Sequence, residues 1–494
     1  MKIVTETPYL PIRGLPPWLL NLAVVFLVCG YCAGIGLMAG SERWTITALL
    51  IAAPVAVIGA ALVGHYFQMV VLLLPLSALI LPIAEIGTGS ETRLPLSLLL
   101  TLALGGLWIA AMYRRGWKIV ASPLNAPLVV FAAICTISLF WGIIWRDPIL
   151  LPWSGTSFVV VQIASLVTIL ASLGAGLLIG NFVTTRRQVG WVLGCFTVVG
   201  VLMTFSQMLG LNQSVLNDRG LWGLWHTAAV VGLLVAQPKI RWYWRAALLL
   251  ALGLNLYHTM IVNSLWVSGW LPSVTGVAAV VFFASRRLFF SLLLVVALVA
   301  GQPLFAYITE VNDANVEEGS LQRLTLWEQN WRVVSDHWLF GTGPAGYAIY
   351  YMTFFRADAR STHNNYLDIL AQFGFTGLFV WFWLAIVAVW EGWRLISRAP
   401  PGILRTAAIV ATGGWIAALG SMMLGDWVLP FAFNQGIGGF KYTVYTWLFL
   451  GLLISIRRII ADEEREAEEE ADAIREADFA NAATAGGSVD AAIR

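Results

Sequence analysis

The 494-residue sequence is poor in charge, since Asp, Glu, Lys and Arg together make up only 11% of it, whereas soluble domains carry about 25%. Hydrophobic residues reach 59%. So few charged side chains cannot cover the surface of a protein that is surrounded by water. The composition therefore excludes a soluble globular protein and indicates one that is embedded in a membrane.

Cysteine is also scarce, and all four cysteines lie in apolar segments, at Cys29, Cys32, Cys135 and Cys195. The spacing of Cys29 and Cys32 matches a redox pair. Such a pair needs a soluble strand-to-helix setting or further metal ligands, and the surrounding sequence has neither. We therefore expect buried thiols that pack helices, with no disulfide framework, no metal site and no cofactor.

What the sequence does contain is a series of apolar runs of bilayer length, for example residues 18–39, 158–180 and 288–307. At roughly 20 residues for each span, they amount to about fourteen transmembrane segments. A membrane β-barrel would alternate polar and apolar residues instead. The predicted fold class is an all-α polytopic membrane protein.

These runs and the polar segments between them divide the chain into five parts. The predicted parts are an N-terminal cytoplasmic segment (1–17), a bundle of about eleven spans (18–308), a long polar extracytoplasmic loop (309–365), about three further spans (366–458) and a charged cytoplasmic tail (459–494). The tail is rich in Glu, and we expect a solvated helix that frays into disorder.

Positive charge is distributed unevenly along the chain. If the N-terminus is cytoplasmic and the spans alternate, twenty of the 29 Lys and Arg fall on the cytoplasmic side, which satisfies the positive-inside rule. Both termini are then cytoplasmic, and loop 309–365 is extracytoplasmic. The twenty residues are Lys2, Arg13, Arg114, Arg115, Lys118, Arg186, Arg187, Lys239, Arg241, Arg245, Arg286, Arg287, Arg394, Arg398, Arg405, Arg457, Arg458, Arg465, Arg475 and Arg494.

The polar loop contains an amphipathic pattern with apolar residues at spacings of three and four. This periodicity predicts a helix, and its tryptophans favour a position flat in the membrane interface. Arg323 then lies near the start of the helix, at the level of the phosphate headgroups. The apolar residues of the pattern are Leu324, Trp327, Trp331, Val334 and Trp338.

Two arginines are candidates for binding phosphate. Arg323 begins the amphipathic helix, and Arg219 lies at the outer end of another predicted span. A guanidinium group donates two parallel hydrogen bonds and keeps its charge, so two such groups beside a bilayer suggest a lipid diphosphate substrate. Two simpler alternatives remain: Arg323 could reach a lipid headgroup, and Arg219 could pair with Asp218.

His363 is the candidate general base. It precedes two amides, Asn364 and Asn365, at the entrance of the span that begins with Tyr366. A neutral imidazole at this position could accept a proton from a sugar hydroxyl, and the amides could orient it or bind hydroxyls. The predicted substrate-binding side chains are Asn364, Asn365, Trp327 and Tyr366. Asp368 is the next candidate for the base.

Residues 341–346 satisfy the pattern Gly-x-Gly-x-x-Gly, which can bind nucleotides. No predicted strand precedes them, Pro344 lies in the middle, and the predicted side is extracytoplasmic. We therefore expect a tight turn after the amphipathic helix and no nucleotide site.

Two blocks resemble the O-antigen ligase and O-antigen polymerase superfamily of bacterial membrane glycosyltransferases. Residues 323–344 are similar to the family's Arg/Trp helix with its Phe-Gly-x-Gly-Pro turn. Residues 363–378 look like its His-Asn-x-x-Leu block with a Gly-x-x-Gly helix. Two departures stand out: Arg219 and Gly220 lead into a Trp-rich segment, and residues 267–270 lack the arginine of a Ser-Arg-Gly block.

The resemblance implies a metal-independent, inverting transfer of a glycan from an undecaprenyl-diphosphate carrier. The acceptor would be a hydroxyl of a glycan, glycolipid or protein on the outer face of the bacterial inner membrane. His363, Arg323 and Arg219 would be the catalytic residues, and lipid would be a partner but nucleic acid would not. Ligase and polymerase activity stay equally open. The competing interpretations are a transporter or flippase for lipid-linked sugars and an inactive scaffold of a polysaccharide assembly complex.

Overall fold

The computed structural model describes residues 9–11, 67–79, 86–87, 93–116, 118–150, 156–210, 220–237, 239–262, 267–299, 321–354, 361–431 and 437–491. The long or functionally important helices are α5 (Leu96–Arg115), α6 (Asn125–Ile144), α7 (Thr156–Phe182), α8 (Arg186–Met208), α9 (Trp222–Ala236), α10 (Trp242–Tyr257), α11 (Val267–Ala284), α13 (Leu321–Asp336), α14 (Tyr347–Phe354), α15 (Asn365–Arg398), α16 (Ile403–Ser421) and α18 (Phe440–Ala491). The short helices are α3 (Phe67–Val71), α4 (Leu74–Leu79), η1 (Pro148–Leu150), η3 (His258–Val262) and η5 (Ile437–Gly439).

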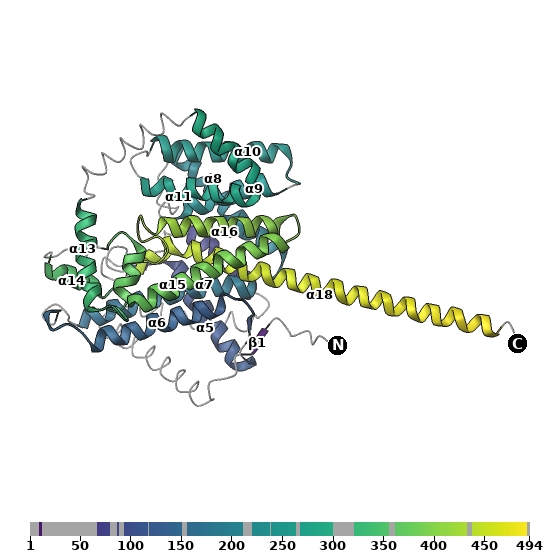
Figure 1. Cartoon of the computed structure of the whole chain (residues 1–494), viewed down its shortest axis with the longest axis horizontal. Helices are drawn as coiled ribbons and strands as arrows, with labels where there is room; N and C mark the ends of the chain where they lie inside the picture. Colours follow the sequence, from purple (N-terminus) through teal and green to yellow (C-terminus); the bar gives the residue numbers. More distant parts are fainter. Residues whose placement is uncertain are drawn as a thin grey trace.

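Helices dominate the structure, as predicted, and within the described ranges nine of them are long and apolar enough to cross a membrane (Figure 1). The predicted total of about fourteen spans stays a prediction, because the first predicted span, 18–39, lies outside the described residues. Among the residues that the structure describes, four strands of two or three residues form two antiparallel pairs. They are β1 (Tyr9–Pro11) with β4 (Lys118–Val120) and β2 (Ile86–Gly87) with β3 (Arg93–Leu94).

Helices α7 and α18 pack closely because glycines line their contact. A Cβ atom on Gly176 would lie 2.8 Å from the carbonyl oxygen of Trp447, and one on Gly451 would lie 2.2 Å from the carbonyl oxygen of Gly176. Small residues allow two backbones to approach, which strengthens dispersion where lipid provides no hydrophobic driving force between helices. Helix α18 is thereby fixed at the centre of the bundle.

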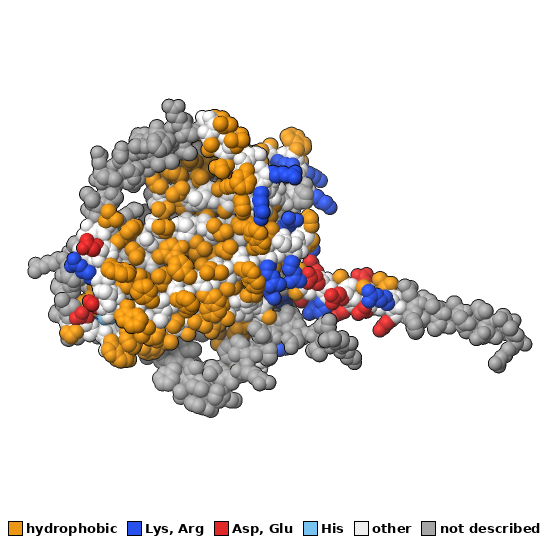
Figure 2. All heavy atoms as spheres, in the orientation of Figure 1, with side chains coloured by type: hydrophobic (Ala, Val, Ile, Leu, Met, Phe, Trp, Pro, Cys, Tyr) orange, Lys and Arg blue, Asp and Glu red, His pale blue; other side chains and the backbone are white. Residues whose placement is uncertain are grey.

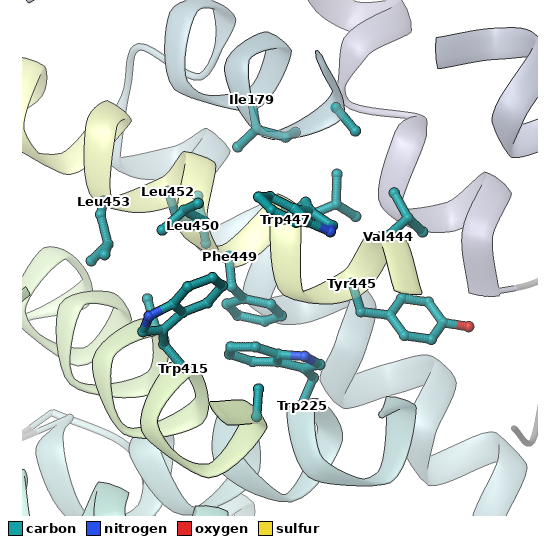
Figure 3. Packing of buried hydrophobic residues seen from close by; sticks show 14 of the residues in the cluster. Ile179, Trp225, Trp415, Val444, Tyr445, Trp447, Phe449, Leu450, Leu452 and Leu453 are labelled. Carbon is teal, nitrogen blue, oxygen red and sulfur yellow. The ribbon is translucent and has the colours of Figure 1, made fainter. Parts of the chain in front are cut away.

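The same part of α18 carries an aromatic core (Figure 3). The rings of Trp225 and Phe449 stack with centroids 4.1 Å apart, and Trp415 and Trp447 meet edge to face at 6.2 Å. The indole N–H of Trp447 donates to the carbonyl of Val428 at 3.0 Å. The core of the bundle therefore also holds the loop that follows α16, which takes part in the candidate site.

The two ends of the bundle differ in charge (Figure 2). Lys and Arg side chains gather at the end from which the acidic part of α18 projects, where Arg186 pairs with Glu463 and Arg398 with Glu464. Helices α13 and α14 lie at the opposite end (Figure 1). This segregation agrees with the charge pattern predicted from the sequence.

The two described cysteines, Cys135 and Cys195, are buried free thiols, as expected. Cys29 and Cys32 lie outside the described residues. His226, inside α9, is buried and its Nδ1 lies 3.0 Å from the carbonyl oxygen of Phe196.

Candidate functional site

The amphipathic helix predicted in the polar loop is present as α13, which runs crosswise to the spans at the end of the bundle opposite the tail (Figure 1). The side of α13 that packs against the protein shares the buried residue Val334 with the predicted interfacial stripe. Leu326, Asn330 and Val334 are buried, whereas Leu324 and Trp331 are more than half exposed. The exposed residues of the stripe lie on the outward side of α13. The buried residues lie on the adjacent side, against the protein.

The glycine-rich segment 341–346 forms the predicted turn. Gly341 and Gly343 have φ of +68° and +88°, and Ala345 has φ of +55°. Positive φ is easily reached by glycine, which has no Cβ. The segment is therefore a compact turn between α13 and α14.

Opposite this turn, α15 is broken at Gly374, whose φ of +67° and ψ of −169° are not helical. The break exchanges backbone hydrogen bonds in both directions with residues 338–343, which lead into the turn and begin it. The bonds are Thr342 N to Ala371 O (2.9 Å), Gly343 N to Gln372 O (3.0 Å), Phe375 N to Trp338 O (2.8 Å) and Thr376 N to Leu339 O (3.4 Å). Backbone groups that leave a helix in a bilayer must find partners, and here the turn provides them.

Buried polar side chains of other helices complete this junction. Ser138 of α6 lies 2.6 Å from the carbonyl oxygens of Phe340 and Gln372, and Gln162 of α7 donates to Thr342 O at 3.0 Å. The junction therefore fixes the first half of α15, residues 365–373, against the turn.

His363 lies immediately before this half-helix and is partly buried. Its φ of +53° is unusual for a residue with a side chain. The hydroxyl of Ser361 accepts the backbone N–H of His363 at 3.1 Å, and the same oxygen lies 3.5 Å from its Nδ1. Residues 361–364 thus form a constrained turn that presents an imidazole, which we name the His363 turn.

Asp368 lies beneath the His363 turn and is 1% exposed. Its Oδ1 accepts hydrogen bonds from the phenol of Tyr347 and from the hydroxyl (2.7 Å) and backbone N–H (3.4 Å) of Thr362. Its Oδ2 accepts from the amide of Asn365 at 3.4 Å. Both carboxylate oxygens therefore have donors from the protein.

The amides next to His363 are used by the fold. The side chain of Asn364 caps α15 by accepting from the backbone N–H groups of Tyr366 (3.0 Å) and Leu367 (3.4 Å). Asn365 accepts from the N–H groups of Val428 and Leu429 at 3.0 and 3.1 Å, and donates to Leu429 O at 3.0 Å. The hydroxyl of Tyr366 donates to the carbonyl of Leu419 at 2.8 Å.

Helix α13 is attached directly to the His363 turn. The indole N–H of Trp327 donates to Thr362 O at 3.0 Å, and the amide of Asn330 donates to Leu367 O at 3.2 Å. Arg323 lies one helical turn before Trp327, so its backbone position is on the same face of α13. The structure thereby brings the helix that carries Arg323 beside His363.

The third candidate, Arg219, lies outside the described residues. Its neighbour Gly220 has φ of +74°, and a Cβ there would lie 2.5 Å from the carbonyl oxygen of Tyr442 at the start of α18. The residue after Arg219 therefore contacts the N-terminal end of α18.

The sequence did not single out a second pair of titratable groups, His337 and Tyr350, whose Nε2 and hydroxyl lie 2.7 Å apart. Burial lowers the pKa of His337, against the opposing charges of Asp336 and Asp147, and burial together with Asp147 raises the pKa of Tyr350. Tyr347 and Thr362 were missed as well, since no spacing links them to Asp368. Within the described part of the chain, no group of three or more His, Cys, Asp or Glu could hold a metal ion.

Comparison with known proteins gives one family. No curated protein matches the chain. The family model described as O-antigen ligase matches residues 215–382, a segment that includes Arg219, α13, the glycine-rich turn and the His363 turn. This segment thus carries the site assembled above, and the family indicates a glycosyltransferase-like ligase or polymerase in polysaccharide assembly. Residues 215–382 thus match the O-antigen ligase family, as the sequence blocks predicted.

Proposed function

We propose that this protein transfers a glycan from an undecaprenyl-diphosphate carrier to an acceptor hydroxyl on the outer face of the bacterial inner membrane. The observation that carries the proposal is the His363 turn, which is fixed beside the helix of Arg323 inside the segment matched by the O-antigen ligase family. The end of the bundle with fewer Lys and Arg side chains in view, where this site lies, is the extracytoplasmic end in this proposal (Figure 2).

In the reaction, the acceptor oxygen attacks the anomeric carbon of the donor sugar while the bond from that carbon to the phosphate oxygen breaks. Undecaprenyl diphosphate leaves with the electron pair. A single displacement of this kind inverts the anomeric centre. Because the diphosphate is a stable anion, catalysis depends mainly on stabilising the charge that develops on the bridging oxygen.

Arg323 and Arg219 supply that stabilisation in our proposal. Hydrogen bonds to charged groups contribute about 1.5–3 kcal/mol each. The donor's lipid chain lies in the bilayer, so its diphosphate comes to the level of the headgroups. In our proposal α13, which runs crosswise to the spans, lies at that level (Figure 1). Arg323, at the beginning of that helix, is the arginine closest in sequence to Trp327 and its contact with the His363 turn.

His363 takes the proton of the acceptor hydroxyl as the new glycosidic bond forms. A general base contributes about 10²–10⁴ in rate. The side chains of Asn364, Asn365, Trp327 and Tyr366 are already bonded to the protein, so we assign them to shaping the site, and direct contact with substrate stays a prediction.

The broken helix α15 also bears on the transporter alternative, because broken helices often line ion and substrate sites in transporters. Here the carbonyls freed at the break are those of Ala371 and Gln372, and both accept hydrogen bonds from the glycine-rich turn. Since these carbonyls are occupied by the protein, they favour a structural role for the break over ion coordination.

The proposal is tested by the His363→Ala variant in nanodiscs. Single-turnover transfer should fall by at least about a hundredfold, while binding of the lipid-diphosphate donor changes little, because the proton is removed only as the acceptor attacks. The matched control is His337→Gln, in the same polar segment, which should keep wild-type transfer. Wild-type turnover by folded His363→Ala would show that His363 is not the base.

A further inference from the structure

We propose that Asp368 is a positioning residue, which holds His363 in its constrained conformation by binding the residues on either side of it. This inference rests on the proposed function, since it assigns the buried carboxylate a role in the same site. It also separates Asp368 from the role of base, for which Asp368 was the next candidate after His363.

The contacts of Thr362 carry the first step of the argument. The hydroxyl of Thr362 donates to Asp368 Oδ1 at 2.7 Å, and the backbone N–H of Asn364 points back to that same hydroxyl at 3.2 Å. The hydroxyl oxygen also lies 2.9 Å from the carbonyl oxygen of Asn364. Hydrogen bonds thus link Thr362 and Asn364, the residues on either side of His363, and Thr362 is in turn hydrogen-bonded to the carboxylate of Asp368.

This anchoring explains how His363 keeps a φ of +53°. A side chain at positive φ costs free energy and persists only where the surroundings determine the conformation. Asp368 fixes Thr362 on one side, and the cap made by Asn364 fixes the start of α15 on the other. The backbone conformation of His363 is therefore fixed, and with it the direction of its Cα–Cβ bond.

The surroundings of Asp368 fit an anchor and not a base. A base must reach the acceptor hydroxyl, yet Asp368 is 1% exposed and both of its oxygens have donors from the protein. Among the described residues these donors are neutral groups, and no Lys or Arg pairs with the carboxylate. Asp368 also lies in the first turn of α15, at the positive end of the helix dipole.

The anchor also connects the elements that carry the catalytic groups. Tyr347 joins it from α14, and Trp327 of α13 donates to the carbonyl of Thr362, the residue held by Asp368. A shift of Thr362 therefore moves α13 relative to His363. Misplacing catalytic groups by about 1 Å can cost a hundredfold in rate.

The test compares Thr362→Val with Thr362→Ser. Valine keeps the shape of threonine and loses the hydroxyl, whereas serine keeps the hydroxyl. We expect Thr362→Val to lower kcat by about tenfold to a hundredfold, with the KM of the lipid-diphosphate donor changed less than about threefold, and Thr362→Ser to stay within about threefold of wild type. The acid limb of the pH–rate profile, which reports the base, should shift in Thr362→Val only.

The control for a buried Thr→Val change is Thr412→Val in α16, whose hydroxyl donates to the carbonyl of Ala408 in the same helix at 2.6 Å. It should leave kcat and the pH profile unchanged. If Thr362→Val does not fold, Tyr347→Phe removes another donor from the same oxygen of Asp368 and should give the same pattern with a smaller loss.

His363→Ala, measured in parallel, separates the two proposals. If His363→Ala is inactive and folded Thr362→Val and Tyr347→Phe keep wild-type kcat and pH profile, the positioning role is overturned and the proposed function stands. If His363→Ala is active but Asp368→Asn is inactive, Asp368 is the base, and both assignments are wrong.

Discussion

Two buried carboxylates at opposite ends of the bundle are held in different ways. At the Lys- and Arg-rich end, Glu391 is 0% exposed and Arg457 binds it at 2.7 Å. At the other end, Asp368 is equally buried, but its described partners are a phenol, a hydroxyl, a backbone N–H and an amide. One carboxylate is neutralised by a cation, and the other is solvated by the protein.

The difference shows what each end requires. An ion pair fixes two helices, and its geometry tolerates small shifts because Coulomb attraction falls slowly with distance. Directional hydrogen bonds fix positions more narrowly, since they weaken steeply when bent. The hydrogen bonds around Asp368 therefore fix the position of the His363 turn, and the ion pair of Arg457 attaches α18 to α15.

The comparison depends first on which end faces the cytoplasm. A reporter fused after Arg458 should be cytoplasmic, and a reporter inserted at Asn315 should be extracytoplasmic, because Lys and Arg are retained on the inner side. Protease protection or reporter activity in intact cells measures this directly. If both reporters lie on one side, the orientation is wrong, and with it the assignment of the site to the outer face.

The second prediction concerns the ion pair. Arg457→Met leaves the carboxylate of Glu391 buried without its cation. We expect the free energy of unfolding to fall by about 3 kcal/mol. This value is at the lower end for broken buried pairs because Arg457 is about a third exposed. Arg186→Met, which removes the exposed partner of Glu463, should cost less than about 1 kcal/mol.

Thermal unfolding in detergent compares the two variants. The double variant Arg457→Met, Glu391→Gln should recover most of the loss, since no buried charge remains. Equal losses in Arg457→Met and Arg186→Met would mean that burial does not distinguish these pairs.

The third and smallest effect concerns Arg323. Arg323→Lys keeps the charge but loses the planar fork that binds two phosphate oxygens, so transfer should fall by about tenfold to a hundredfold. The control is Arg332→Lys in the same helix, where Arg332 is exposed and lies 3.5 Å from Glu328. Transfer assays with folded protein decide the case, and equal activity of both variants would remove Arg323 from phosphate binding.

Sequence periodicity predicted the helical class, α13 and the glycine-rich turn, because each depends on residues close together in the chain. It did not predict which edge of α13 is buried. Trp and Leu are favourable both against protein and in a membrane interface, so hydrophobicity alone does not distinguish the face with Leu326 from the edge with Trp331.

The site was predictable only in part for a similar reason. His363 could be found from its block, whereas the contacts of Asn365 with Val428 and Leu429 join residues more than 60 positions apart. The role of Asp368 depends on Tyr347, which enters from another helix. Such contacts follow from tertiary packing, and no local pattern encodes them.

The junction between the glycine-rich turn and the break in α15 has a consequence for how related sequences can vary. Its four reciprocal bonds use main-chain atoms, so the side chains of Trp338, Leu339 and Ala371 can change without removing them. The glycines cannot change in the same way, since a Cβ on Gly374 would lie 2.3 Å from Leu339 O and one on Gly341 2.4 Å from the carbonyl carbon of Gln372. We expect homologues to keep these two glycines while the residues around them vary. The backbone conformation of the junction would then be conserved although most of its side chains are not.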